Sequence, residues 1–237
     1  MNIPSLLSLQ WRGMRRDEQM ASLALLIGVV VTTLHRQACG VDALPATGLL
    51  ASDTARVWAY YGATVLLFGL LPALVIRVLW KDALADYGVC IGDWKFGLRA
   101  IAVLLPVISL LFLLPAASME DMRATYPVDR AAGDSLSRFL VHSAGRLLLF
   151  YAAWEFLFRG FLLFGLRRIS GDAVAICVQT IPSALWHINY PAGELYMSIA
   201  GGLLFGWLAL RTRSVLWPLL LHAGIGVVTD ASIILSL

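Results

Sequence analysis

Long apolar runs separated by short charged connections constrain this chain more than any other feature. A helix that crosses a bilayer needs about 20 mostly apolar residues. Seven such runs lie near 21–36, 57–79, 98–117, 143–166, 173–190, 195–210 and 214–235. Only 14% of the residues are charged, against about 25% in soluble domains. The sequence therefore predicts an all-α, multi-pass transmembrane helical bundle of about seven spans, with six or eight as alternatives.

The 237 residues are expected to form a single integral membrane domain, 1–237. No small-residue cleavage site follows the first apolar run, so we expect a retained span and not a signal peptide. The mixed segment 80–96 is expected to be a cytoplasmic connection that contains an interfacial helix.

Basic residues gather in alternate connections. They are Arg12, Arg15 and Arg16; then Arg77, Lys81, Lys95 and Arg99; then Arg167 and Arg168; and finally Arg211 and Arg213. The positive-inside rule makes these connections cytoplasmic. We therefore expect a cell-membrane protein whose N-terminus is cytoplasmic and whose C-terminus lies outside. The small net charge of +3 forms no basic stripe of the kind that nucleic acid requires.

The fourth apolar run contains an acid and a base four residues apart, Glu155 and Arg159. Residues at this spacing share one helix face, so we expect the two side chains to touch. Ionisable groups at membrane depth are costly and mark functional sites by default. The alternative is a structural ion pair that neutralises itself between helices.

Other polar residues fall in or beside later runs. His187 lies near the end of the fifth, Glu194 lies just before the sixth, and His222 and Asp230 lie in the seventh. Each also has a simpler interpretation: a histidine can be a hydrogen-bonded packing residue, and Glu194 and Asp230 can be solvated at span ends. Arg146 is expected to reach the outer interface along its own side chain.

Together these residues favour a hydrolytic site inside the bundle. Glu155 with His187 would deprotonate a water molecule. His222 would donate a hydrogen bond to the developing oxyanion. Arg159 would hold Glu155 in position.

The order and spacing of these motifs resemble the CPBP family, the CAAX proteases and bacteriocin-processing enzymes also called Abi proteins. Its Glu-Glu-x-x-x-Arg motif corresponds to Trp154, Glu155 and Arg159, and its Phe-x-x-x-His motif to Ser183 and His187. A Pro-x-x-Glu stretch corresponds to Pro191 and Glu194, and a small-residue helix follows from 198 to 206. The last motif, His-x-x-x-Asn or Asp, corresponds to His222 and Gly226. The resemblance covers residues 140–235 as a catalytic core.

This resemblance implies a glutamate-dependent intramembrane endopeptidase, similar to the type II CAAX prenyl endopeptidase. In that enzyme a glutamate and a histidine activate water, and a second histidine with an asparagine forms the oxyanion hole. The chain departs from the pattern at Trp154, which replaces the first glutamate, at Ser183, which replaces an aromatic residue, and at Gly226. Asn189 and Asp230 are candidates to replace the missing amide, and Asn189, Glu194 and Asp230 are candidate substrate-binding residues.

Family members have also been described as metalloproteases, and Glu155, His187 and His222 would form a known zinc ligand set. The sequence has no His-Glu-x-x-His motif, and Arg159 would compete with a cation, so we favour metal-free hydrolysis without a cofactor. Cys39, Cys90 and Cys177 have no metal-binding spacing.

The expected partners are the lipid bilayer and a peptide or protein substrate, either lipidated or ending in a membrane segment. One alternative is an inactive family member that acts as a bacteriocin-immunity or scaffold protein, which the departures at Trp154 and Gly226 favour. Another alternative is a proton-coupled transporter. Transporters typically contain an inverted repeat with paired broken helices, and the absence of such a repeat from this sequence argues against that alternative.

Overall fold

The computed structural model describes Trp11 and residues 13–236, and within these residues every regular element is helical. Arg12, one of the basic residues expected before the first span, lies outside the described residues. Six helical stretches are long and apolar enough to cross a membrane. The prediction of an all-α, multi-pass bundle is confirmed.

The first three spans are longer than the sequence predicted. They are α2 (Arg16–Ala38), then α3 (Asp53–Thr64) continued by η3 (Val65–Leu70), α4 (Leu71–Leu74) and η4 (Val75–Trp80), and then α5 (Trp94–Ile108) continued by η6 (Ser109–Leu113) and α6 (Leu114–Ala116). Short 3₁₀ turns, η1 (Val41–Ala43) and η2 (Gly48–Leu50), connect the first two. The connection between the second and third spans contains only the four-residue turn η5 (Leu84–Tyr87). The prediction of an interfacial helix in this connection is therefore wrong.

A fourth stretch, Leu136–Leu185, has 50 residues, more than twice the length that one crossing requires. Its parts are α8 (Leu136–Gly145), η8 (Arg146–Tyr151), α9 (Ala152–Glu155), η9 (Phe156–Leu162) and α10 (Leu163–Leu185). Within α10, Gly171 has a φ of 74°, a left-handed conformation that glycine adopts without a steric penalty. The chain reverses there, so this stretch contributes two spans and the bundle has about seven.

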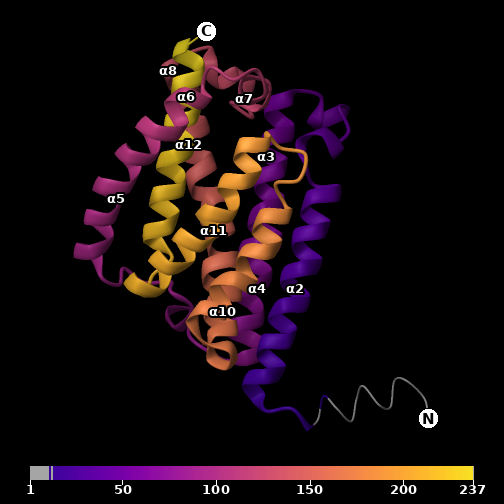
Figure 1. The fold of residues 1–237 in the computed structure, drawn as a ribbon. Coiled ribbons are helices and arrows are strands. Elements are labelled where there is room, and N and C mark those ends of the chain that lie inside the picture. Colours follow the sequence, from indigo (N-terminus) through magenta and orange to yellow (C-terminus); the bar gives the residue numbers. More distant parts are fainter. Residues whose placement is uncertain (1–10, 12, 237) are drawn as a thin grey trace.

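The last two spans are α11 (Ala192–Thr212) and α12 (Leu216–Ser236). Before the fourth span, α7 (Glu120–Thr125) and the turn η7 (Arg130–Gly133) lie at the upper end of the bundle (Figure 1). Helix α11 packs closely on α10 because Gly202 lies against Thr180 and Gly206 against Gln179. Gln179 also donates a hydrogen bond to the Gly202 carbonyl, so these glycines serve packing within the bundle.

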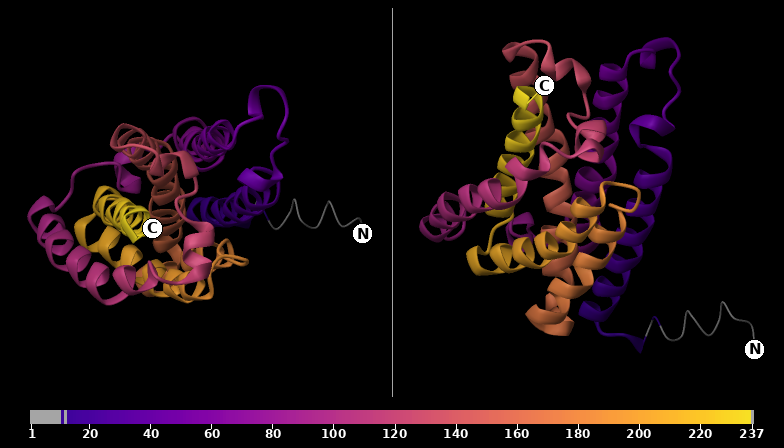
Figure 2. Two further views of the ribbon diagram at one scale, coloured as in Figure 1. Left: turned by 90° about the horizontal axis from the view of Figure 1, so that it is seen from above. Right: turned by 45° about the horizontal axis from the view of Figure 1, so that its top comes forward.

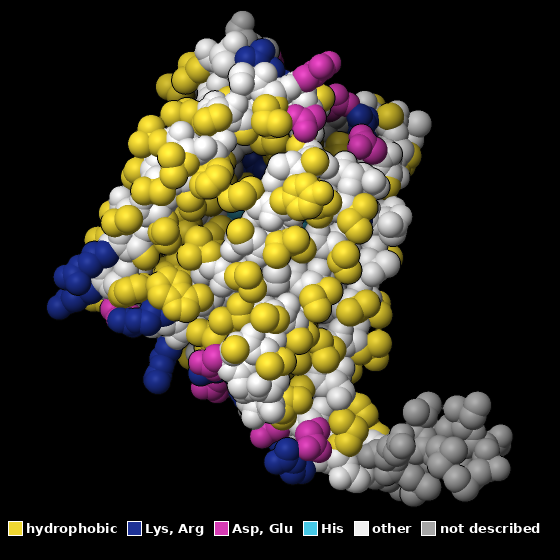
Figure 3. All heavy atoms as spheres, viewed as in Figure 1, with side chains coloured by type: hydrophobic (Ala, Val, Ile, Leu, Met, Phe, Trp, Pro, Cys, Tyr) yellow, Lys and Arg dark blue, Asp and Glu magenta, His cyan; other side chains and the backbone are white. Residues whose placement is uncertain are grey.

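The fourth span runs through the centre of the bundle and is the most deeply buried one. Helix α5 lies on the outside, beside α11 and α12, and most of its surface is exposed (Figure 2). In Figure 3, hydrophobic side chains cover the middle of the molecule and most charged side chains lie toward its two ends. This banding is what a bilayer-spanning protein needs, because charged groups are costly in the hydrocarbon layer.

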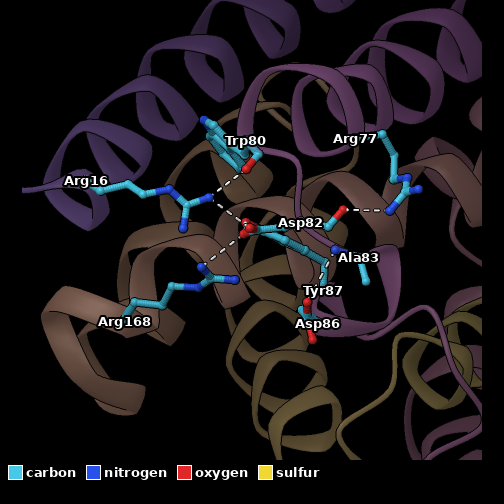
Figure 4. Close-up of polar contacts among 8 residues, drawn as sticks. All are labelled: Arg16, Arg77, Trp80, Asp82, Ala83, Asp86, Tyr87 and Arg168. Carbon is cyan, nitrogen blue, oxygen red and sulfur yellow. Dashed lines mark hydrogen bonds and ion pairs between the residues drawn. The ribbon is translucent and has the colours of Figure 1, made fainter.

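Asp82 links the ends of α2 and α10 through hydrogen bonds (Figure 4). Its carboxylate accepts hydrogen bonds from Arg16 of α2 at 2.9 Å, from Arg168 of α10 at 3.1 Å and from the Tyr87 hydroxyl at 3.1 Å. Partial burial acts to raise the pKa of Asp82, but the hydrogen bonds from Arg16 and Tyr87 outweigh it, so the pKa lies below its ordinary value.

We expect Asp82→Asn to lower the free energy of unfolding by about 1–2 kcal/mol, because a hydrogen-bonded charge is lost. Since the folded-state pKa of Asp82 is lowered, its stabilising effect is present above the unfolded pKa and is lost as the pH falls through the folded one. Thermal unfolding in detergent across a pH series tests this. A difference between the two proteins that is the same at neutral and at strongly acidic pH would contradict it.

Candidate active site

Glu155 and Arg159 lie in the centre of the bundle, at the junction of α9 and η9. Their side chains are 0% and 2% exposed, and Arg159 Nη1 lies 3.3 Å from Glu155 Oε1. The contact expected from their spacing is therefore present. Its depth means that neither charge has water to solvate it, so each relies on its protein partners.

His222 of α12 is the second partner of Glu155. Its Nδ1 lies 2.6 Å from Glu155 Oε1. An ionised carboxylate only accepts hydrogen bonds, so Nδ1 is the donor and Nε2 is the ring nitrogen left for other partners. This hydrogen bond connects the fourth span to the seventh.

His187 makes a different pair from the one predicted. Its Nδ1 donates to the Ser183 carbonyl at 2.8 Å, and its Nε2 lies 3.8 Å from Glu194 Oε1. Glu194 Oε1 also accepts a 2.6 Å hydrogen bond from the Tyr126 hydroxyl. The carboxylate that faces His187 is thus Glu194, from the first turn of α11, and Glu155 faces His222 instead.

All these groups except Glu155 surround one cavity of about 580 Å³, a volume typical of small-ligand sites. His187, His222, Glu194 and Arg159 form part of its wall, as do Tyr151 and Trp154. Glu155 is not among the described residues that line it, because it lies behind His222. Figure 3 shows a hollow in the upper half of this face, with a histidine side chain visible inside.

The remaining wall is apolar and reaches the outer surface of the bundle. Leu111 and Phe112 of η6 and Met197 of α11 line the cavity and are each more than 40% exposed. An apolar cavity that is continuous with a membrane-facing surface can receive a hydrophobic chain directly from the bilayer.

Trp154 occupies the position where the resemblance has a glutamate. Its ring is 1% exposed and meets the His187 ring edge to face, with centroids 5.7 Å apart. It also packs against Trp186 at 4.9 Å. A side chain at position 154 therefore does reach His187, but here the contact is aromatic.

Two other candidates lie away from the reacting groups. Asn189 is exposed in the turn before α11 and does not line the cavity, so it is not placed to substitute for the amide missing at position 226. Asp230 is 1% exposed and binds Arg146 at 2.7 Å, with His142 Nε2 at 3.4 Å. The solvated interpretation of Asp230 is therefore wrong.

Arg146 is also buried, and the prediction that it reaches the outer interface is wrong. Asp230 on α12 supplies a counter-charge inside the bundle, and the rings of Tyr126 and Tyr151 lie 5.3 and 5.1 Å from the guanidinium carbon. These partners satisfy the charge in the interior, so the side chain has no need to extend to the interface.

The side-chain arrangement does not fit the zinc set of Glu155, His187 and His222. Among the residues that the structure describes, no three His, Cys, Asp or Glu side chains are grouped closely enough to hold a metal ion. Arg159 also places a positive charge directly against Glu155.

Sequence reasoning missed the aromatic residues that shape the site. Tyr126 holds Glu194, Tyr151 packs on His222, and Trp186 is held by a hydrogen bond from its Nε1 to His35 Nδ1 at 3.2 Å. Their one signal was a high density of aromatic residues near the motifs, which is also common in ordinary packing.

The segment that carries Glu155, Arg159, His187, Glu194 and His222 is similar to a known family. Residues 137–228 match the family model described as type II CAAX prenyl endopeptidase Rce1-like. Over this segment the chain resembles that family. The match confirms the resemblance seen in the motifs and supports a peptidase of the CAAX type. Comparison with curated proteins and with solved structures gives no significant match.

We expect Asp230→Ala to lower the free energy of unfolding by about 3–5 kcal/mol, because it leaves Arg146 buried without its counter-charge. The double change Asp230→Ala with Arg146→Met should recover part of that loss. Thermal unfolding in detergent measures both effects. A double variant that is less stable than Asp230→Ala would contradict the ion-pair explanation.

Proposed function

We propose that this protein is an intramembrane endopeptidase that hydrolyses a peptide bond in a membrane-associated or C-terminal substrate segment. The observation that supports it best is the cavity, where two imidazoles and Glu194, all three from the Rce1-like segment, face one apolar space. The alternating basic connections favour a cell-membrane location with a cytoplasmic N-terminus.

The proposed substrate is a peptide whose reactive bond lies beside a lipid group or an apolar segment. The membrane-facing wall of Leu111, Phe112 and Met197 suits such a chain, which would otherwise have to leave the bilayer to reach the site. The family description, a CAAX prenyl endopeptidase, makes a prenylated C-terminus the first substrate to try.

In the proposed reaction, a water molecule lies between His187 and Glu194. The separation of 3.8 Å is too long for a direct hydrogen bond, and we place the water on the cavity side of the pair, within reach of both atoms. His187 Nδ1 donates to Ser183, so in the neutral ring Nε2 is an acceptor. Glu194 is the second acceptor and the proposed general base, and it takes the role that sequence reasoning gave to Glu155.

Attack forms a bond between the water oxygen and the carbonyl carbon while a proton passes to the His187–Glu194 pair. The carbonyl oxygen becomes an oxyanion. When the C–N bond breaks, the retained proton passes to the leaving nitrogen, so the pair acts as base and then as acid. No metal ion takes part in this scheme.

His222 is the proposed partner of the oxyanion. In its imidazolium form Nδ1 donates to Glu155 and Nε2–H is free to donate into the cavity. Glu155 and Arg159 are then positioning residues: Glu155 orients the His222 ring, and Arg159 holds Glu155.

We expect Glu155→Ala, His187→Ala and His222→Ala each to abolish cleavage of a quenched farnesylated CAAX peptide by the purified protein. The wild type should cleave this peptide in buffer containing EDTA, because no step requires a metal. Membrane insertion and yield should be unchanged in His187→Ala, whereas Glu155→Ala leaves the buried Arg159 without its carboxylate, so its activity is compared per amount of folded protein. Full cleavage by Glu155→Ala would exclude this site. The immunity or scaffold alternative predicts a different result. The wild-type protein would then cleave no peptide, and function in cells would be unaffected by all three changes.

We expect Glu194→Gln to reduce kcat by about 10²–10⁴-fold, the usual contribution of general acid–base catalysis, with KM unchanged. The amide keeps the size of the side chain and an oxygen for Tyr126, so stability should be preserved. Glu120→Gln, the same change at an exposed position of α7, is the matched control. A raised KM with wild-type kcat would show that Glu194 binds substrate, the role that the sequence suggested.

A further inference from the structure

Gly226 leaves space beside His222 that another side chain fills. A Cβ atom built on Gly226 would lie 2.1 Å from the Tyr151 hydroxyl oxygen, far inside van der Waals contact. Any larger residue at position 226 would have to displace this hydroxyl. Gly226 is therefore what allows Tyr151 to place its hydroxyl one helical turn beyond His222.

Tyr151 is fixed in this position by its neighbours. Its ring centroid lies 4.4 Å from that of His222, and the guanidinium carbon of Arg146 lies 5.1 Å from the ring. Phe150 meets it edge to face at 5.3 Å. A ring held by three contacts and 4% exposed has little freedom to move, which is the condition for a preorganised donor.

The Tyr151 hydroxyl is also free to act. Tyr151 lines the cavity, and its hydroxyl makes no hydrogen bond to any residue that the structure describes. The buried polar atoms that lack partners include the Tyr61 hydroxyl but not that of Tyr151, so the latter is accessible from the cavity. A phenol carries one O–H donor, which would here find its partner in a bound molecule.

We propose that Tyr151 is a catalytic residue whose hydroxyl donates a hydrogen bond to the oxyanion, alongside His222. This inference rests on the proposed peptidase function and assigns the second oxyanion donor. Two donors from different helices, one on η8 and one on α12, would converge on one oxygen atom. Position 226 on the seventh span is a glycine and has no side chain that could donate a hydrogen bond. The second oxyanion donor is therefore Tyr151, on the fourth span.

The test is Tyr151→Phe, which removes one oxygen atom and keeps the ring contacts. We expect kcat for the quenched farnesylated CAAX peptide to fall about 10²–10³-fold, the usual effect of removing one oxyanion donor. KM and the unfolding temperature in detergent should stay at the wild-type values. Tyr196→Phe is the matched control, because Tyr196 is exposed on α11 and does not line the cavity.

Gly226→Ala is a second variant that leaves Tyr151 chemically intact. Its added methyl group must displace the hydroxyl, so kcat should fall by a similar factor. Wild-type kcat in Tyr151→Phe, with His222→Ala inactive, would overturn this assignment and leave the peptidase proposal standing. A raised KM with unchanged kcat would also overturn it, since a transition-state donor acts on kcat. A wild type unable to cleave the peptide would overturn both proposals.

Discussion

The hydrogen bond between Glu155 and His222 is the interaction on which the site depends. It joins the fourth span to the seventh deep in the bundle, where Glu155 is fully buried and His222 is reached only from the cavity, and Arg159 supplies the neighbouring positive charge. A charge left unpaired there would cost several kcal/mol, so the three side chains must be placed together or not at all. The pairing also sets the direction of the His222 ring, and so determines which ring nitrogen faces the cavity.

A second polar pair, His187 with Glu194, stands on the other side of the same space. It belongs to the turn that joins the fifth and sixth spans and to the first turn of α11, where an acidic side chain interacts favourably with the helix dipole. Aromatic rings fill the space around both pairs, with Trp154 against His187 and Tyr151 against His222. The departures at Trp154 and Gly226 thus have the same consequence: an aromatic ring occupies the space, and a polar group from another position faces the cavity.

Much of the fold could be predicted because hydropathy reports directly on burial in lipid. The seven predicted runs correspond to the six long apolar helical stretches of the described residues, two of the runs falling in Leu136–Leu185, with ends displaced by several residues. The contact of Glu155 with Arg159 was also predictable, since it depends only on helical spacing. Apart from the interfacial helix predicted in 80–96, the failures were the partners of Arg146, Asp230 and His187, each of which lies on another helix. Sequence spacing carries no information on the rotation of one helix relative to another.

The sequence by itself determined a multi-pass helical membrane protein and a segment, 137–228, that resembles the Rce1-like family. These properties follow from local patterns: run length, charge placement and motif spacing. Only the tertiary structure decided which carboxylate meets which imidazole, that Glu155 lies behind His222 while Glu194 faces the cavity, and that Tyr151 occupies the space above Gly226. Those relations depend on how six or more helices pack around one cavity, where contacts of a few ångströms join residues far apart in the chain.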